Sequence, residues 1–178
     1  ESEVGTMFIQ REMSIEAFLS FVEKHPEQRF DFIDGEMVEV WPKPSHSKKQ
    51  ARFASAFDLY LQSHPEIGVV YTEVLVVLNG EKFLPDVCVA EDSSASYLSQ
   101  PPLVVVEIRS ESQSREAQRR KIRAYLQYGV QMAILVLPGE TVEVYRPGQA
   151  VLILTAADTL DGDDVLAGFK LPLERILP

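Results

Sequence analysis

The chain has 178 residues, 46% of them hydrophobic and 25% charged, and its formal net charge is −10. This length suits one domain with a sizeable core, and no apolar run is long enough to predict a membrane-spanning helix. The acidic balance argues against broad, non-specific nucleic-acid binding, but it leaves room for a local basic groove.

The N-terminal residues lack the features of a signal peptide. Met7 is compatible with a natural start. We therefore treat residues 1–6 as an added remnant and expect one domain over residues 7–178. The single cysteine, Cys88, lies inside an apolar run, where we expect it to be a small core residue. It cannot form an internal disulfide or a zinc cluster, which fits a cytoplasmic location.

The first half of the chain predicts two helices separated by hairpin strands. In chain order we expect a helix over residues 14–25, strands over 29–33 and 36–41, a helix over 45–63, and strands over 68–78 and 81–84. Ser14 predicts the N-cap of the first helix, and Ser45 or Ser47 that of the second. Asp34-Gly35 and Asn79-Gly80 are typical of two-residue hairpin turns.

The second half predicts a sheet interrupted by one long helix. We expect strands over residues 87–90 and 103–108, a helix over 113–128, strands over 132–137, 141–145 and 151–154, and a short helix over 173–177. The loop over residues 91–100 is polar, with a helical turn expected at 95–98. The run from Leu103 to Ile108 is nearly all apolar, typical of a strand buried on both faces. This order of elements indicates a mixed α/β or α+β domain around one sheet.

Two acids lie at the ends of predicted strands. Asp86 precedes the strand over 87–90, and Glu107 nears the end of the strand over 103–108. If these strands are neighbours, the carboxylates converge, and together with a backbone carbonyl and waters they suit Mg²⁺ or Mn²⁺. Such an ion polarises a phosphoryl oxygen, and a nearby lysine stabilises developing charge. Because acids at strand ends are common, their spacing alone is weak evidence.

Basic residues gather in two segments. The first contains Lys43, Lys48, Lys49 and Arg52, and the second contains Arg109, Arg115, Arg119, Arg120, Lys121 and Arg123. Each segment is either a solvated helix face or a local groove for phosphates.

An ordered set of short motifs spans most of the chain. The segments are Asp31 to Val38, Pro44-Ser45-His46, Pro85-Asp86-Val87, Pro101 to Ser110, and Lys121, Tyr125 and Gly129-Val130. In this order they resemble the Uma2-type restriction endonuclease family (DUF820) of the PD-(D/E)XK nuclease superfamily. The resemblance implies a restriction-endonuclease-like core, with a central mixed sheet flanked by helices, an extra N-terminal hairpin and a C-terminal meander.

The resemblance also implies an activity, the metal-dependent hydrolysis of DNA phosphodiester bonds. Asp86 and Glu107 would bind Mg²⁺ or Mn²⁺, with the backbone carbonyl of Ile108. The wider superfamily has a lysine two residues after the second acid, where this chain has Arg109. Arginine stays protonated, so Arg109 would hold a phosphate or stabilise charge but make a poor base. Lys121, on the following helix, would instead orient the water or stabilise charge.

Two further residues have two interpretations each. Glu36 would be a third carboxylate or an outward-facing hairpin residue. His46 would lie near the site or serve as a solvated or helix-capping residue.

The chain also departs from the family pattern. Ala117 stands where an aspartate is usual, and residues 110–113 depart from the usual Ser-Pro-Ser-Thr. The alternative is therefore a catalytically degenerate nuclease-fold protein that binds nucleic acid or a protein partner. We expect a homodimer, since cutting both strands of a duplex favours two sites related by a two-fold axis.

Overall fold

The computed structural model describes most of the chain from residue 14 onward. The described residues are 14–26, 28, 30–33, 36–39, 43–109, 114–139 and 141–177. Residues 1–6 and the expected Asp34-Gly35 turn lie outside them. In the part described, no helix is both long and apolar enough to cross a membrane.

A six-stranded mixed sheet forms the centre of the fold, in the order β10-β9-β8-β7-β6-β3. The strands are β3 (Val69–Thr72), β6 (Val87–Ala90), β7 (Val104–Ile108), β8 (Met132–Leu137), β9 (Thr141–Tyr145) and β10 (Leu152–Leu154). Only β7 and β8 pair in parallel; the other neighbours in this sheet are antiparallel. Every residue of β6, β7 and β8 is buried, as their apolar sequences predict.

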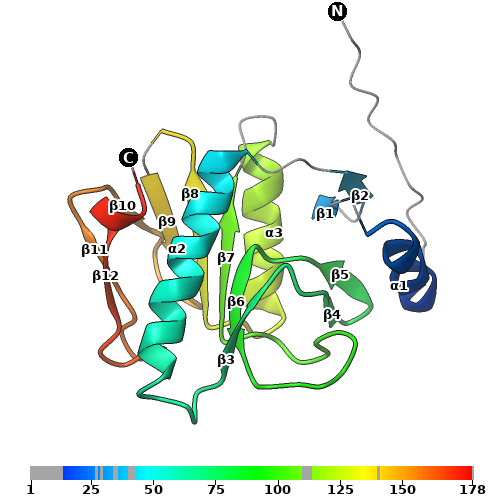
Figure 1. Cartoon of the computed structure of the whole chain (residues 1–178). Coiled ribbons are helices and arrows are strands. Elements are labelled where there is room, and N and C mark those ends of the chain that lie inside the picture. Colours follow the sequence, from blue (N-terminus) through cyan, green and yellow to red (C-terminus); the bar gives the residue numbers. More distant parts are fainter. Residues whose placement is uncertain are drawn as a thin grey trace, which may run out of the picture.

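Two long helices cover opposite faces of this sheet, so that it lies between α2 (Pro44–Leu61) and α3 (Arg115–Gln127) (Figure 1). On the α2 side the core includes Phe53, Phe57, Val87, Val89, Val104 and Val106. On the α3 side it includes Cys88, Val105, Ile122, Tyr125, Ala133 and Leu135. Alternate residues of each strand thus face different helices, which is the two-residue period of a strand.

The N-cap prediction for α2 was wrong. The helix begins at Pro44 with Lys43 as its N-cap, and Ser45 and Ser47 lie inside the helix. The first helical position suits proline, because the N–H there has no partner within the helix and the fixed φ of proline is helical. The helix therefore starts before the serines. The N-caps of the other two α-helices are serines. Ser14 accepts a hydrogen bond from Ala17 at the start of α1 (Ile15–Lys24), as predicted, and Ser114 caps α3.

The single strand expected over residues 68–78 is two strands. The second, β4 (Val76–Leu78), leaves the main sheet and pairs with β5 (Glu81–Phe83) in the hairpin that Asn79-Gly80 predicted. Glu73 separates β3 from β4 with a φ of 52°, a left-handed conformation that ends an extended strand. The helical turn expected at residues 95–98 is absent, because Leu98 instead pairs with Val76 in a β-bridge.

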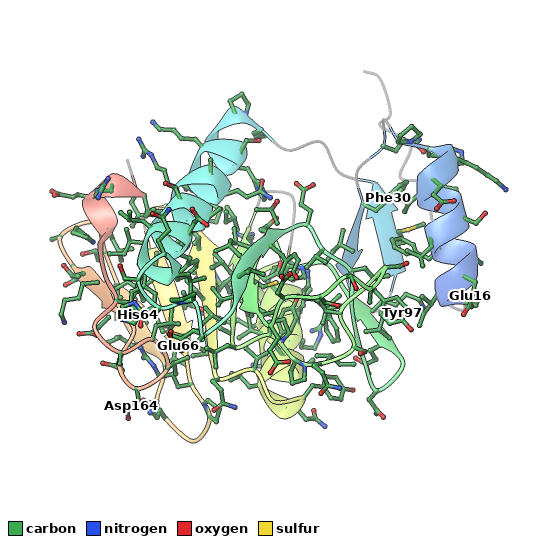
Figure 2. The ribbon with its side chains drawn as sticks, turned by 60° about the horizontal axis from the view of Figure 1, so that its bottom comes forward. Glu16, Phe30, His64, Glu66, Tyr97 and Asp164 are labelled. Atoms are coloured by element: carbon green, nitrogen blue, oxygen red, sulfur yellow. The ribbon has the colours of Figure 1, made fainter. Side chains whose placement is uncertain are left out.

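The N-terminal elements form a small second core beside the sheet. The strands β1 (Phe30–Ile33) and β2 (Glu36–Glu39) pair as an antiparallel hairpin. Phe18, Phe30 and Met37 are buried together with residues of β4 and the segment before it. Figure 2 shows Phe30 and Tyr97 beside α1, and Phe30 meets Phe21 of this helix edge to face.

The C-terminal segment packs on the α2 side of the sheet. It contains β11 (Thr159–Asp161), β12 (Lys170–Pro172) and η1 (Leu173–Arg175). The terminal helix is a three-residue 3-10 turn, shorter than the 173–177 expected. Leu160, Leu166 and Leu173 are fully buried against the core.

Candidate active site

Strand pairing places Asp86 and Glu107 across from each other. Val87 of β6 pairs with Val106 of β7 in antiparallel register. Asp86 precedes Val87 and Glu107 follows Val106, so the two acids take the next opposing positions. Opposing residues of an antiparallel pair lie on the same side of the sheet. The Asp86 carboxylate contacts α2 and the Glu107 carboxylate contacts α3, so the convergence of the two carboxylates on one ion stays a prediction.

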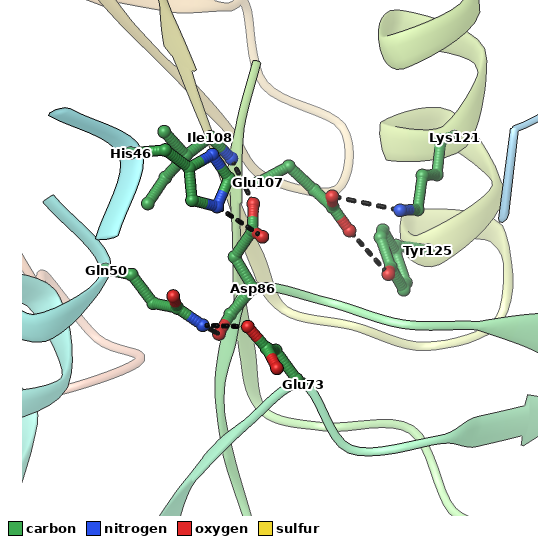
Figure 3. Close-up of polar contacts among 8 residues, drawn as sticks. All are labelled: His46, Gln50, Glu73, Asp86, Glu107, Ile108, Lys121 and Tyr125. Carbon is green, nitrogen blue, oxygen red and sulfur yellow. Dashed lines mark hydrogen bonds and ion pairs between the residues drawn. The ribbon is translucent and has the colours of Figure 1, made fainter. Parts of the chain in front are cut away.

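Both carboxylate oxygens of Asp86 have partners (Figure 3). Oδ2 accepts a hydrogen bond from the backbone N–H of Ile108 at 2.6 Å, which ties Asp86 to the end of β7. Oδ1 lies 2.9 Å from Nε2 of His46, in the first turns of α2. His46 is thus neither a cap nor a purely solvated residue, and it lies beside the predicted site.

Glu107 is buried with a lysine and a tyrosine from α3. Its Oε2 lies 2.9 Å from Nζ of Lys121, and its Oε1 accepts a hydrogen bond from the Tyr125 hydroxyl at 2.7 Å. Glu107 is 3% and Lys121 8% exposed. Lys121 and Tyr125 are four residues apart on α3, so both point to the same face (Figure 3). The helix therefore presents a buried ammonium and a hydroxyl to one carboxylate.

Two polar residues of this region were missed by the sequence interpretation. Gln50 donates from Nε2 to the backbone carbonyl of Asp86 at 3.0 Å and to Oε1 of Glu73 at 3.2 Å. The backbone N–H of Glu73 in turn points to the Pro85 carbonyl at 3.2 Å. Gln50 follows His46 by four residues on α2, and this spacing is the one sequence signal that could have placed it near the site.

The structure says less about the two remaining candidate residues, Arg109 and Glu36. Arg109 is half-buried at the end of β7, and its backbone N–H donates to the Val136 carbonyl at 2.9 Å. Glu36 begins β2, but its side chain lies outside the described part of the structure. The roles of both residues stay predictions.

A second acid lies on the same face of the sheet. Glu143 of β9 pairs with Leu135 of β8, which pairs in turn with Glu107. Glu143 is 3% exposed and accepts hydrogen bonds from Arg119 of α3 and from the Tyr145 hydroxyl. Burial, and then the hydrogen bond to Glu143, raises the pKa of Tyr145 to about 12. Glu107 and Glu143 thus each contact a basic side chain of α3 and accept a hydrogen bond from a tyrosine hydroxyl.

The thiol of Cys88 lies on this face too and is buried. Burial, and then the negative charge of Glu107, raises its pKa to about 12. Because the thiolate is the reactive form, we expect the native protein at pH 8 to resist a thiol reagent such as DTNB. Absorbance of the released thionitrobenzoate measures this, with the protein in guanidinium chloride as the reactive control. Equal rates in the two samples would contradict the burial of Cys88.

The chemistry of these residues fits a divalent cation of the magnesium type. Asp86 and Glu107 offer hard oxygen ligands, and a carboxylate oxygen that accepts one hydrogen bond keeps a further lone pair. In the part of the chain described, no three His, Cys, Asp or Glu side chains group to hold a metal. A cation here would therefore rest on the two carboxylates, a backbone carbonyl and waters, as Mg²⁺ usually does.

The fold is that of a restriction-endonuclease-like nuclease. It has a mixed sheet with one parallel pair, β7 and β8, which α3 connects, and an acid at the end of each of two central strands. One solved structure with this fold is a crystal structure of a putative nuclease belonging to DUF820 from Anabaena variabilis. It is 22% identical, with a TM-score of 0.78, over 93% of this chain and 97% of that chain. The Uma2 family, described as "Putative restriction endonuclease", matches residues 15–174. The chain belongs to this family. No curated protein matches it.

Proposed function

We propose that this protein is a metal-dependent endonuclease that hydrolyses DNA phosphodiester bonds, with Asp86 and Glu107 holding Mg²⁺ or Mn²⁺. The observation that carries the proposal is the buried group that Glu107, on the strand beside Asp86, forms with Lys121 and Tyr125 of α3. When bound, the ion would polarise a phosphoryl oxygen and lower the pKa of a coordinated water.

The chain's own residues would position and stabilise the reacting groups. Ile108 N–H and His46 fix the orientation of the Asp86 carboxylate. Tyr125 fixes that of Glu107, because its hydroxyl binds one of the two oxygens. Lys121 would orient the attacking water or stabilise charge that develops on the phosphate, and its burial strengthens this effect.

The remaining candidates have supporting roles in the proposal. Arg109 would contact a phosphate, and the carbonyl of Ile108 would be a further ligand of the cation. Glu36 would add a third carboxylate. The protein would act in the cytoplasm as a homodimer, and the exposed apolar residues Leu152 and Ile153 on the edge strand β10 offer a surface for the second copy.

Plasmid cleavage with Mg²⁺ or Mn²⁺ tests the proposal. Asp86→Asn is expected to slow cleavage by about 100-fold or more, because the loss of a metal ligand removes several kcal/mol of transition-state stabilisation. Asp58→Asn, the same change at an exposed position of α2, is the matched control and is expected to cleave like the wild type. If wild type and Asp86→Asn leave DNA equally intact with either metal, the proposal fails.

One observation favours a second candidate, a degenerate nuclease-fold protein that binds nucleic acid or a protein partner. Both oxygens of Glu107 already have partners on α3, and Ala117 stands where the family pattern has an acid. Metal-independent DNA binding that survives Glu107→Gln, with no cleavage by the wild type, would support this alternative. Cleavage that is lost in the same variant would exclude it.

A further inference from the structure

One face of α2 carries a row of basic and hydroxyl side chains. Ser45, Lys48, Lys49 and Arg52 recur at intervals of three or four residues, or lie next to each other, so they share one side of the helix. Lys49 is half-buried and the other three are exposed. We call these four residues the α2 basic stripe.

The α2 basic stripe lies on the helix that also contacts the candidate active site. His46, Gln50 and the buried Phe53 follow one another at intervals of four and three residues, so they lie on the sheet side of α2, where His46 and Gln50 both contact Asp86 (Figure 3). The stripe therefore lies on the solvent side of the helix whose other side contacts Asp86.

The charge of this helix segment opposes that of the whole protein. The chain carries a net charge of −10, yet residues 43–57 contain no acid. No ion pair to Lys48 or Arg52 is found within the described ranges. A local positive surface on an acidic protein attracts a polyanion to that surface and repels it elsewhere.

We infer that the α2 basic stripe binds the phosphate backbone of double-stranded DNA. This inference rests on the proposed function. The stripe spans about 10 Å along the helix, at about 1.5 Å per residue. One DNA strand carries a phosphate about every 3.4 Å of axis, so the stripe faces about three phosphates. Lysine binds phosphate as a point charge without reading bases, so the contact is independent of sequence.

Binding of a fluorescent 30-base-pair duplex in EDTA, measured by anisotropy over a range of salt, tests the stripe without catalysis. In Lys48→Gln/Arg52→Gln, we expect the dissociation constant to rise about tenfold and the slope of log K against log salt to fall by about 2. Both positions are exposed, so the melting temperature should stay unchanged. The matched control is Lys24→Gln/Arg123→Gln, which removes two positive charges from exposed positions on α1 and α3.

The outcomes separate this inference from the proposed function. The inference is overturned if Lys48→Gln/Arg52→Gln keeps the wild-type affinity and salt slope, even if the wild type cleaves DNA. It is also overturned if the control variant loses as much DNA affinity as Lys48→Gln/Arg52→Gln does. Tighter binding of single-stranded RNA than of the duplex would overturn it too. If duplex binding depends on the stripe but the protein cleaves no DNA with any metal, the inference is supported and only the proposed nuclease activity fails.

Discussion

Lys121→Met is expected to lower the free energy of unfolding by about 3–5 kcal/mol, because it leaves the Glu107 carboxylate buried without its counter-charge. The side chains of this pair are only 6% and 4% exposed, so solvent cannot replace the lost partner. Glu107→Gln should cost a similar amount, since it leaves the Lys121 ammonium buried.

The double variant Glu107→Gln/Lys121→Met removes both charges at once. It is expected to be destabilised by less than the sum of the two single variants, because neither charge remains uncompensated. Urea unfolding followed by circular dichroism measures all four proteins. Additive losses, within about 0.5 kcal/mol, would show that the two groups do not interact.

The same variants separate stability from function. If Lys121 and Glu107 act in catalysis, the double variant stays inactive although it regains stability. Cleavage assays at a temperature where all four proteins are folded make this comparison. Activity in the double variant would contradict the role proposed for both residues.

Glu143→Gln is expected to destabilise the protein at neutral pH by about 2–3 kcal/mol, since Arg119 loses its buried partner but keeps partial access to water. Side-chain exposure is 37% for Arg119 and 3% for Glu143. Burial by itself would raise the pKa of Glu143, but the hydrogen bonds from Arg119 and Tyr145 and the nearby positive charges outweigh burial and lower this pKa from its ordinary value.

The sign of this pKa shift sets the pH dependence. Because the folded-state pKa is lowered, Glu143 stabilises the fold above its ordinary pKa, and this contribution is lost as the pH falls through the folded-state value. Melting temperatures from pH 7 to pH 3 should therefore converge between wild type and Glu143→Gln at the acid end. Glu116→Gln, at an exposed i,i+4 pair with Arg120, is the control and should change little at any pH. A constant difference would contradict the lowered pKa.

Much of the fold follows from local patterns. The apolar runs that became β6, β7 and β8 are short and rich in valine, which is typical of central strands, and their predicted bounds agree with the structure to within one residue. The Asn79-Gly80 turn was equally predictable. Both residues have positive φ values, which asparagine and glycine adopt most readily. These features depend on residues that are neighbours in the chain, so the sequence predicts them without knowledge of the tertiary structure.

Other features depend on packing between distant segments. The strand expected over residues 68–78 breaks at Glu73, whose N–H points to Pro85, twelve residues further on. Glu143 alternates with valines like an outward-facing strand residue, but α3 covers that face and buries it with Arg119. No local pattern distinguishes these cases, because the partner that decides them comes from another element.

For the candidate site, the sequence by itself determined which residues we propose for the chemistry: an acid before one strand, an acid near the end of another, and a lysine on the next helix. The tertiary structure alone decided how they meet. The antiparallel register of β6 and β7 sets Asp86 opposite Glu107, and the packing of α3 brings Lys121 and Tyr125 to Glu107. It also brought in His46 and Gln50 from α2, because hydrogen bonds between elements form only once the sheet and helices have packed.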